Sequence, residues 1–138
     1  GALVLGRDDF VDDARRWRQA AGGGMRQAGV IAAAGIVALD TMVDRLAEDH
    51  NNARRLAAHL AGAGLILDFP AEEVETNIVF AEIPADLMDA EAFVMGLAAE
   101  GVQVNPPRDR RIRLLTHHNV SADDIEAAGA IVRKVLGS

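Results

Sequence analysis

The chain has 138 residues, half of them hydrophobic, and a formal net charge of −7. This length fits one domain or a piece of a larger one, and the acidic balance argues against a nucleic-acid partner, which needs a basic face. No apolar run approaches the roughly 20 residues that span a bilayer, no basic leader is visible, and there is no cysteine. We therefore expect a cytoplasmic protein without a membrane partner.

The first half of the chain has helical patterns separated by glycines. Residues 1–6 form an apolar run that we interpret as a buried strand, cut out of a longer chain. A first helix follows, and the glycines at 22–24 end it. Its apolar face consists of Phe10, Ala14 and Trp17. A second helix is predicted over about 26–49, followed by a break at 49–52 and a further helix that ends at Gly62-Ala63-Gly64.

From residue 65 onward, apolar residues recur at every second position between shorter helical segments. Pro84 ends the longest of these strands, and Ser121 is the expected N-cap of the last helix. Helices followed by mixed strands and helices predict an α+β domain, with a small, mainly antiparallel sheet packed against helices. The expected elements are strands at 65–67, 76–83, 102–104 and 111–116, a turn at 105–109, and helices at 89–100 and from 121 onward.

Arg26 follows the glycines at 22–24 and lies directly before an expected helix. Glycines let the backbone approach an anion, and free amides at a helix N-terminus favour negative charge. The guanidinium of Arg26 adds a forked donor suited to phosphate or carboxylate. The same glycines also suit a simple turn between helices, and their spacing leaves both interpretations open.

Arg113 lies in an apolar strand in which it shares one face with Arg111, while Ile112 and Leu114 share the other. An arginine flanked by buried aliphatic residues needs an anionic partner, and bidentate capture of a carboxylate is its natural use. The alternatives are an arginine at the sheet edge in solvent, or one paired with Asp109. Arg113 is favoured over Arg111 because it lies deeper in the apolar run.

The histidines predict no metal site. His117 and His118 are adjacent, so they point to opposite faces of an extended segment, and His50 and His59 lack the spacing of helical metal ligands. No carboxylate is placed to complete a catalytic triad with them. We expect structural or solvent-facing roles for these side chains. Lys134, close to the C-terminus, is the only lysine.

Several blocks in this order resemble the low-specificity L-threonine aldolases, and the resemblance covers nearly the whole chain. The blocks are Ala14–Arg18, Gly22–Gly29, Leu46–His50, Thr76–Phe80 and Arg113–His117. The resemblance implies the aspartate-aminotransferase-like fold of pyridoxal-phosphate enzymes. It places the end of the large cofactor domain and a connecting helix at 1–25, and the small C-terminal domain with its long entry helix at 26–138.

The same resemblance implies that the intact enzyme cleaves L-threonine or L-allo-threonine to glycine and acetaldehyde with pyridoxal phosphate. It implies self-association as a dimer or tetramer with shared sites. Arg113 matches the arginine that binds the substrate α-carboxylate, and Arg26 matches one expected to reach the cofactor phosphate in a neighbouring subunit. Gln19 stands where some relatives carry a lysine. No residue matches the lysine that binds the cofactor covalently, so we expect no catalytic residue here and no activity of the segment alone.

Two alternatives remain at this point. One is another pyridoxal-phosphate enzyme of the same fold, such as a β-eliminating lyase or glycine hydroxymethyltransferase, which shares the carboxylate arginine but is expected to lack the glycine-rich block. The other is a non-catalytic assembly or ligand-binding domain. A Ser-Lys pair just upstream of Gly1 would favour the aldolase.

Overall fold

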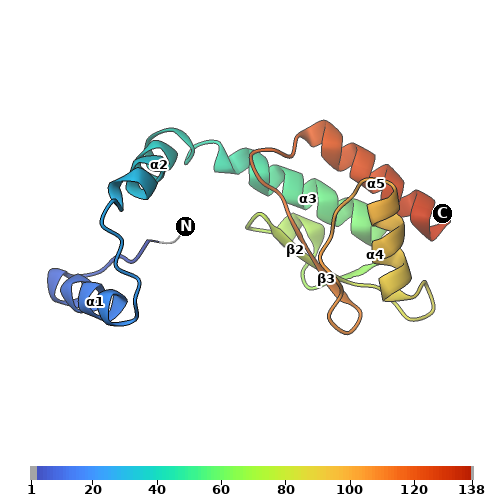
Figure 1. Ribbon diagram of the computed structural model, residues 1–138. Helices are drawn as coiled ribbons and strands as arrows, with labels where there is room; N and C mark the ends of the chain where they lie inside the picture. Colours follow the sequence, from blue (N-terminus) through green and yellow to red (C-terminus); the bar gives the residue numbers. More distant parts are fainter. Residues whose placement is uncertain (1–2, 138) are drawn as a thin grey trace. The chain divides into compact units, whose positions relative to one another are not determined.

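The computed structural model of the chain describes residues 3–137, which form two compact units that divide between Asp44 and Arg45. The first unit contains two helices and the second contains three helices, a short 3-10 helix and a three-stranded sheet (Figure 1). No helix within the described range is long and apolar enough to cross a membrane. The elements are α1 (Asp8–Ala20), α2 (Gly29–Thr41), α3 (Leu46–Gly62), β1 (Ile66–Leu67), η1 (Ala71–Glu73), β2 (Ile78–Glu82), α4 (Ala90–Ala99), β3 (Arg111–Leu115) and α5 (Ala122–Leu136).

The first unit exposes most of its side chains. The described parts of α1 and α2 contain no buried residue, although α2 consists almost entirely of apolar residues. The predicted strand at 1–6 is wrong for residues 3–6, which have no regular structure, and residues 1 and 2 lie outside the described part. A strand forms only against a partner strand, and within the described residues the first unit supplies none.

The predicted helix boundaries in the middle of the chain are wrong. The chain leaves the helical conformation over 42–45, and α3 then runs unbroken through 49–52, where a break was expected. Asp and Asn disfavour helix interiors because their side chains compete for backbone groups. Here both have other partners: the Asp49 carboxylate accepts from Arg45 at 2.7 and 3.0 Å, and Asn52 Nδ2 donates to the Val120 carbonyl at 3.0 Å.

The second unit confirms the predicted α+β fold. Its sheet has the order β1-β2-β3 with both pairs antiparallel, and β2 pairs with β3 so that Phe80 lies opposite Arg113. Helix α3 packs against β1 and β2, and α5 packs against α3 and α4. The domain boundary predicted after residue 25 concerns a larger parent protein, and it stays a prediction.

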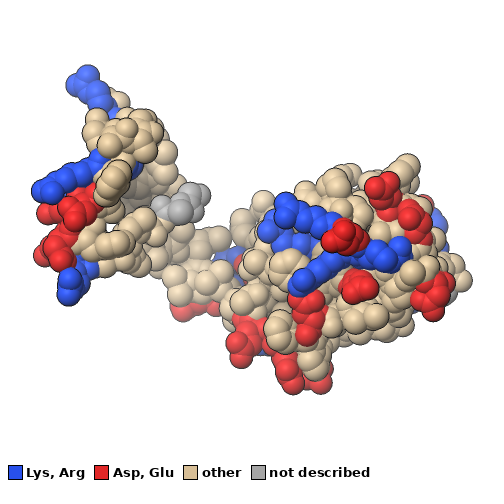
Figure 2. Space-filling model, turned by 90° about the horizontal axis from the view of Figure 1, so that it is seen from below, with Lys and Arg blue, Asp and Glu red and all other residues tan. Residues whose placement is uncertain are grey.

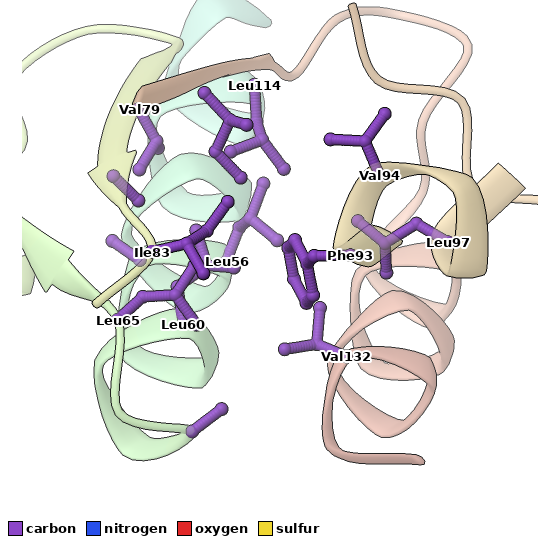
Figure 3. Close-up of a cluster of buried hydrophobic side chains, with 14 of the residues drawn as sticks. Leu56, Leu60, Leu65, Val79, Ile83, Phe93, Val94, Leu97, Leu114 and Val132 are labelled. Atoms are coloured by element: carbon purple, nitrogen blue, oxygen red, sulfur yellow. The ribbon is translucent and has the colours of Figure 1, made fainter. Parts of the chain in front are cut away.

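The core lies between the inner face of the sheet and the helices of the second unit. Phe93 of α4 is fully buried and points into this core among Leu56, Leu97 and Val132 (Figure 3). The strands bury alternate residues, so Leu114 faces inward while Arg113 is exposed. Burial of each such aliphatic or aromatic side chain contributes about 1.5–3 kcal/mol, which fixes the face that each strand turns outward.

The predicted strand at 102–104 is wrong, although the turn that follows it is confirmed as non-helical. Arg108 and Arg111 exchange two backbone hydrogen bonds of 2.9 Å across a tight turn, in which Asp109 has a φ of 46°. Continuing this register by two residues sets Pro106 opposite Arg113. Proline has no N–H to donate to the facing carbonyl. The ladder therefore stops, and the outer edge of β3 stays open.

Two of the predicted helix starts in the second unit are confirmed. Asp89 caps α4 by accepting from the Ala92 N–H at 2.9 Å. Ser121 and Asp124 form a reciprocal capping box at the start of α5, where the Asp124 N–H donates to Ser121 Oγ at 3.2 Å. This cap fixes the turn between the end of β3 and α5.

Candidate functional site

Arg113 projects from the outer face of the sheet. It is exposed, and among residues 3–137 its guanidinium makes no hydrogen bond or ion pair. Asp109, its suggested ion-pair partner, is therefore not bonded to it. The open edge of β3 and the alternation of the strand together leave this side chain available to an anion.

Arg111, two residues earlier on the same face, is already engaged. Its Nη2 forms an ion pair with the Asp68 carboxylate, and its guanidinium carbon lies 4.6 Å from the centroid of the Phe80 ring. A cation over an aromatic face gains electrostatic attraction in addition to the ion pair. Basic and acidic side chains of this unit also lie next to one another on the face drawn in Figure 2. Of the two strand arginines, Arg113 is the one free to bind a ligand.

Two hollows meet at Arg113 along the open edge of β3. One, of about 680 Å³, is lined by Gln103, Asn105, His117 and Asn119 as well as by Arg113. The other, of about 700 Å³, is lined by Phe80 and the prolines at 106 and 107. The first hollow is also lined by apolar residues of α5 and by the carboxylates of Glu100 and Asp124. A forked cation with amide side chains near it suits a small carboxylate, because neutral amides add donors without adding charge.

Arg26 lies in the exposed turn that precedes α2, and its side chain likewise has no partner in the described part of the chain. The preceding glycines fold back against the end of α1. Gly22 has a φ of 79°, and a Cβ added at Gly24 would collide with the side-chain amide of Gln19. The positive φ of Gly22 favours glycine at that position and fits the turn interpretation, and the turn leaves the Arg26 guanidinium free.

Lys134 is occupied on the outside of the second unit. Its Nζ donates to Glu100 Oε2 at 2.6 Å, joining the end of α5 to the end of α4. The side chain is 65% exposed, so it lies in no enclosed site. This placement gives Lys134 a surface ion pair as its observed role.

The histidines make local contacts. His59 Nε2 lies 3.0 Å from Glu126 Oε2 between α3 and α5, and His117 Nδ1 accepts from the Asn119 N–H at 3.2 Å. Within the residues that the structure describes, no three His, Asp or Glu side chains come close enough to hold a metal ion.

Asp49 raises the pKa of Arg45 above its ordinary value, and the largest cause is the hydrogen bond between the two side chains.

Sequence reasoning missed a buried polar cluster behind Arg113. Thr116, Asn77 and Asp49 join the end of β3 to β2 and α3. Thr116 follows Ile112 and Leu114 at every second position on the inward face of the strand. This alternation could have predicted from the sequence that Thr116 is buried. A polar residue at an inward position requires buried partners.

Comparison with known proteins places the chain among lyases. The family model described as "Beta-eliminating lyase" matches residues 1–85. A probable low-specificity L-threonine aldolase 2 from Arabidopsis thaliana is 39% identical over 100% of this chain, and a low specificity L-threonine aldolase from Escherichia coli is 38% identical over 99%. The chain spans only 39% and 38% of the length of these two relatives.

A solved structure shows the same fold. An ornithine aminotransferase from Plasmodium yoelii matches 73% of this chain and 26% of its own chain, with a TM-score of 0.54 and 14% sequence identity. At this identity the likeness concerns the fold alone. It confirms the aspartate-aminotransferase-like fold that the sequence resemblance implied.

Proposed function

The chain belongs to the beta-eliminating lyase family, and from that premise we propose that it is the C-terminal part of a pyridoxal-phosphate-dependent low-specificity L-threonine aldolase. The intact enzyme cleaves L-threonine or L-allo-threonine to glycine and acetaldehyde. The carrying observation is the unpaired guanidinium of Arg113 on the outer sheet face, beside a hollow whose mixed lining includes Gln103, Asn105 and Asn119. The names and identities of the two aldolase relatives support this activity over others in the family.

Arg113 holds the substrate α-carboxylate in this proposal. A planar guanidinium binds a carboxylate through two parallel N–H···O bonds, which orient the substrate as well as attract it. Orientation matters because the bond that breaks, Cα–Cβ, must stand in one direction relative to the cofactor. Arg111 cannot take this role without giving up Asp68 and Phe80.

Arg26 binds the cofactor phosphate, in the site of a neighbouring subunit. Its side chain is exposed and free in the described part of the chain, and it follows a turn in which Gly22 has a positive φ. The residues present thus fit the two anionic groups, phosphate and carboxylate. The cofactor, when bound, supplies the electron sink for cleavage of the Cα–Cβ bond.

No residue of this chain fits the covalent attachment of the cofactor. Lys134, the only lysine, is paired with Glu100 on the surface of α5. We infer that the lysine and the groups that hold the cofactor ring belong to the rest of the enzyme, and that this segment is inactive alone. Gln19 is exposed near the end of α1, with its side-chain amide close to Gly24.

Self-association accompanies this function. The helix α2 exposes Val30, Ile31, Ile36 and Leu39, each more than half accessible within the described chain. An apolar surface of this kind marks a contact with another protein surface. A dimer or tetramer with shared sites would bury it and bring Arg26 to a neighbouring subunit.

A β-eliminating lyase of the same fold is the second candidate. We expect such a lyase to lack the glycine-rich block, and the family match over residues 1–85 does not test this. The names of the aldolase relatives favour the aldolase.

The test is a product assay with the full-length enzyme. Incubation with L-threonine and L-allo-threonine should release acetaldehyde and glycine in equal amounts. Incubation with L-serine should release no pyruvate and ammonia at a comparable rate. Pyruvate formation without aldehyde release from threonine would favour the β-eliminating lyase, and neither product would favour a non-catalytic domain.

A further inference from the structure

The end of β3 is held by a buried side chain whose polar atoms are all used. Thr116 is 1% exposed and directly follows the strand that carries Arg113. Its N–H donates to the Asn77 carbonyl at 3.0 Å, and its carbonyl accepts from Asn77 Nδ2 at 2.7 Å. Its hydroxyl donates to the Asp49 carbonyl at 2.7 Å. One residue thus joins β3 to β2 and to α3.

The α3 side of this connection is itself held in place. Asp49 is 3% exposed, and its carboxylate accepts two hydrogen bonds from Arg45, at 2.7 and 3.0 Å. Asn52, one turn further on, donates to the Val120 carbonyl at 3.0 Å. The first turns of α3 therefore bind both Thr116 and the loop that follows it, and they offer the Thr116 hydroxyl a fixed acceptor.

Near Arg113, the strand is restrained by its pairing with β2 and by the burial of Ile112 and Leu114, but it is paired along one edge only. The strand pairs with β2 along one edge, while Pro106 prevents the hairpin ladder along the other. Strand residues two apart lie on the same face, and a slip of one residue turns each side chain to the opposite face. Thr116, three positions after Arg113, is the described residue that restrains this end from the helix side as well as from β2.

We propose that Thr116 is a positioning residue for Arg113. It does not touch the substrate; its hydroxyl bond to the Asp49 carbonyl keeps the end of β3 in register, and this fixes where the Arg113 guanidinium projects. A displacement of about 1 Å at a binding group can cost on the order of 100-fold in rate. The inference rests on the carboxylate role proposed for Arg113.

The experiment uses the full-length enzyme with its cofactor. Thr116→Val removes the hydroxyl at nearly constant volume, Thr116→Ser keeps it, and Thr116→Ala is the replacement if the valine variant does not fold. Thr76→Val is the matched control, because the Thr76 hydroxyl makes only an exposed bond with the Ile78 N–H at 3.2 Å. The measurements are kcat/KM for L-threonine, the equilibrium Kd for glycine, and hydrogen exchange at the Leu114 amide.

We expect Thr116→Val to raise the glycine Kd roughly 10-fold. This effect is smaller than the loss of about 100-fold in rate that a displacement of 1 Å can cause. Hydrogen exchange at the Leu114 amide should be faster in this variant. Thr116→Ser and Thr76→Val should stay within about twofold of wild type in both the glycine Kd and the exchange rate at Leu114. Combined with Arg113→Ala, Thr116→Val should add almost nothing to the loss, because residues that act as a unit are not additive.

Three results would overturn the inference, and each has a different meaning. Fully additive losses in the double variant would show a structural role of Thr116 that does not act through Arg113. If Arg113→Ala left the glycine affinity unchanged, this result would instead refute the proposed carboxylate-binding role of Arg113. If Thr116→Ser raised the glycine Kd as much as Thr116→Val, this result would contradict the role of the hydroxyl.

Discussion

Arg111 and Arg113 project from the same face of β3, yet only Arg111 is bonded: it pairs with Asp68 and stacks on Phe80, while Arg113 is unpaired within the described residues. Two identical side chains two residues apart thus have different roles. The engaged arginine stabilises the loop after β1, and the free one can bind an anion.

This difference predicts opposite outcomes for the two alanine substitutions in the full-length enzyme. Arg113→Ala removes a charge-assisted pair with the substrate carboxylate, worth about 1.5–3 kcal/mol, so kcat/KM should fall roughly 10- to 150-fold. Cofactor absorbance should persist. Arg111→Ala, the matched control, should lower thermal stability and leave kcat/KM within about threefold. Equal kinetic losses in the two variants would contradict the assignment.

A second prediction concerns Arg26. If its guanidinium binds the cofactor phosphate, Arg26→Ala should weaken cofactor retention by roughly 10-fold or more, since bonds to charged groups contribute about 1.5–3 kcal/mol. The cofactor Kd from absorbance titration measures this. Arg18→Ala, an exposed arginine at the end of α1, is the control and should leave the Kd unchanged. An unchanged Kd for Arg26→Ala with a normal oligomer would leave only the turn interpretation.

A third prediction concerns the 138-residue chain alone. Mixed with pyridoxal phosphate and L-threonine, it should release no acetaldehyde, because its only lysine is paired with Glu100 at the surface. Sedimentation should show an oligomer, since α2 exposes apolar side chains. Turnover that Lys134→Ala abolishes would show that the catalytic lysine lies in this chain after all.

A fourth prediction concerns pH and the start of α5. The Ser121 hydroxyl, and then its backbone N–H, hold the pKa of Asp124 below its ordinary value of 3.8. A carboxyl group with a lowered pKa in the folded state stabilises the fold above its unfolded pKa, and this contribution is lost as the pH falls through the folded pKa. Thermal stability should therefore decrease below about pH 4, where unfolded aspartate begins to protonate.

Two substitutions separate this effect from general acid denaturation. Ser121→Ala should lower stability near pH 7 by about 1 kcal/mol through loss of the cap and flatten the decrease in acid. Asp123→Asn, at a neighbouring first-turn carboxylate that has no place in the capping box, should keep the wild-type pH dependence. Melting curves from pH 7 to pH 2 measure both, and identical profiles for Ser121→Ala and wild type would refute the linkage.

Local signals predicted much of the second unit and the end of α1 in the first. The helix start at Asp89, the N-cap Ser121, the glycines that end α1 and α3, and the alternation in β2 and β3 act through neighbours within a few residues. Such signals are readable because a cap or a strand face depends on short-range geometry. The candidate site residues Arg26 and Arg113 were likewise visible from motif and alternation.

Two predictions failed because of partners outside the segment concerned. Asp49 and Asn52 were read as a helix break, but Arg45 and the Val120 carbonyl satisfy their side chains, and α3 continues. The segment 102–104 alternates like a strand, but the turn at Asp109 sets a register in which Pro106 faces Arg113. Neither cause is visible in the segment itself.

By itself, the sequence determined the fold class and most elements of the second unit, and it indicated two arginines as candidates for binding anions, because periodicity, caps and motif blocks are local properties. Only the tertiary structure decided which strand arginine is free, since Asp68 and Phe80 reach Arg111 from other parts of the chain. It also decided that Thr116 joins α3, β2 and β3, because a buried hydroxyl takes whichever acceptor the packed helix presents.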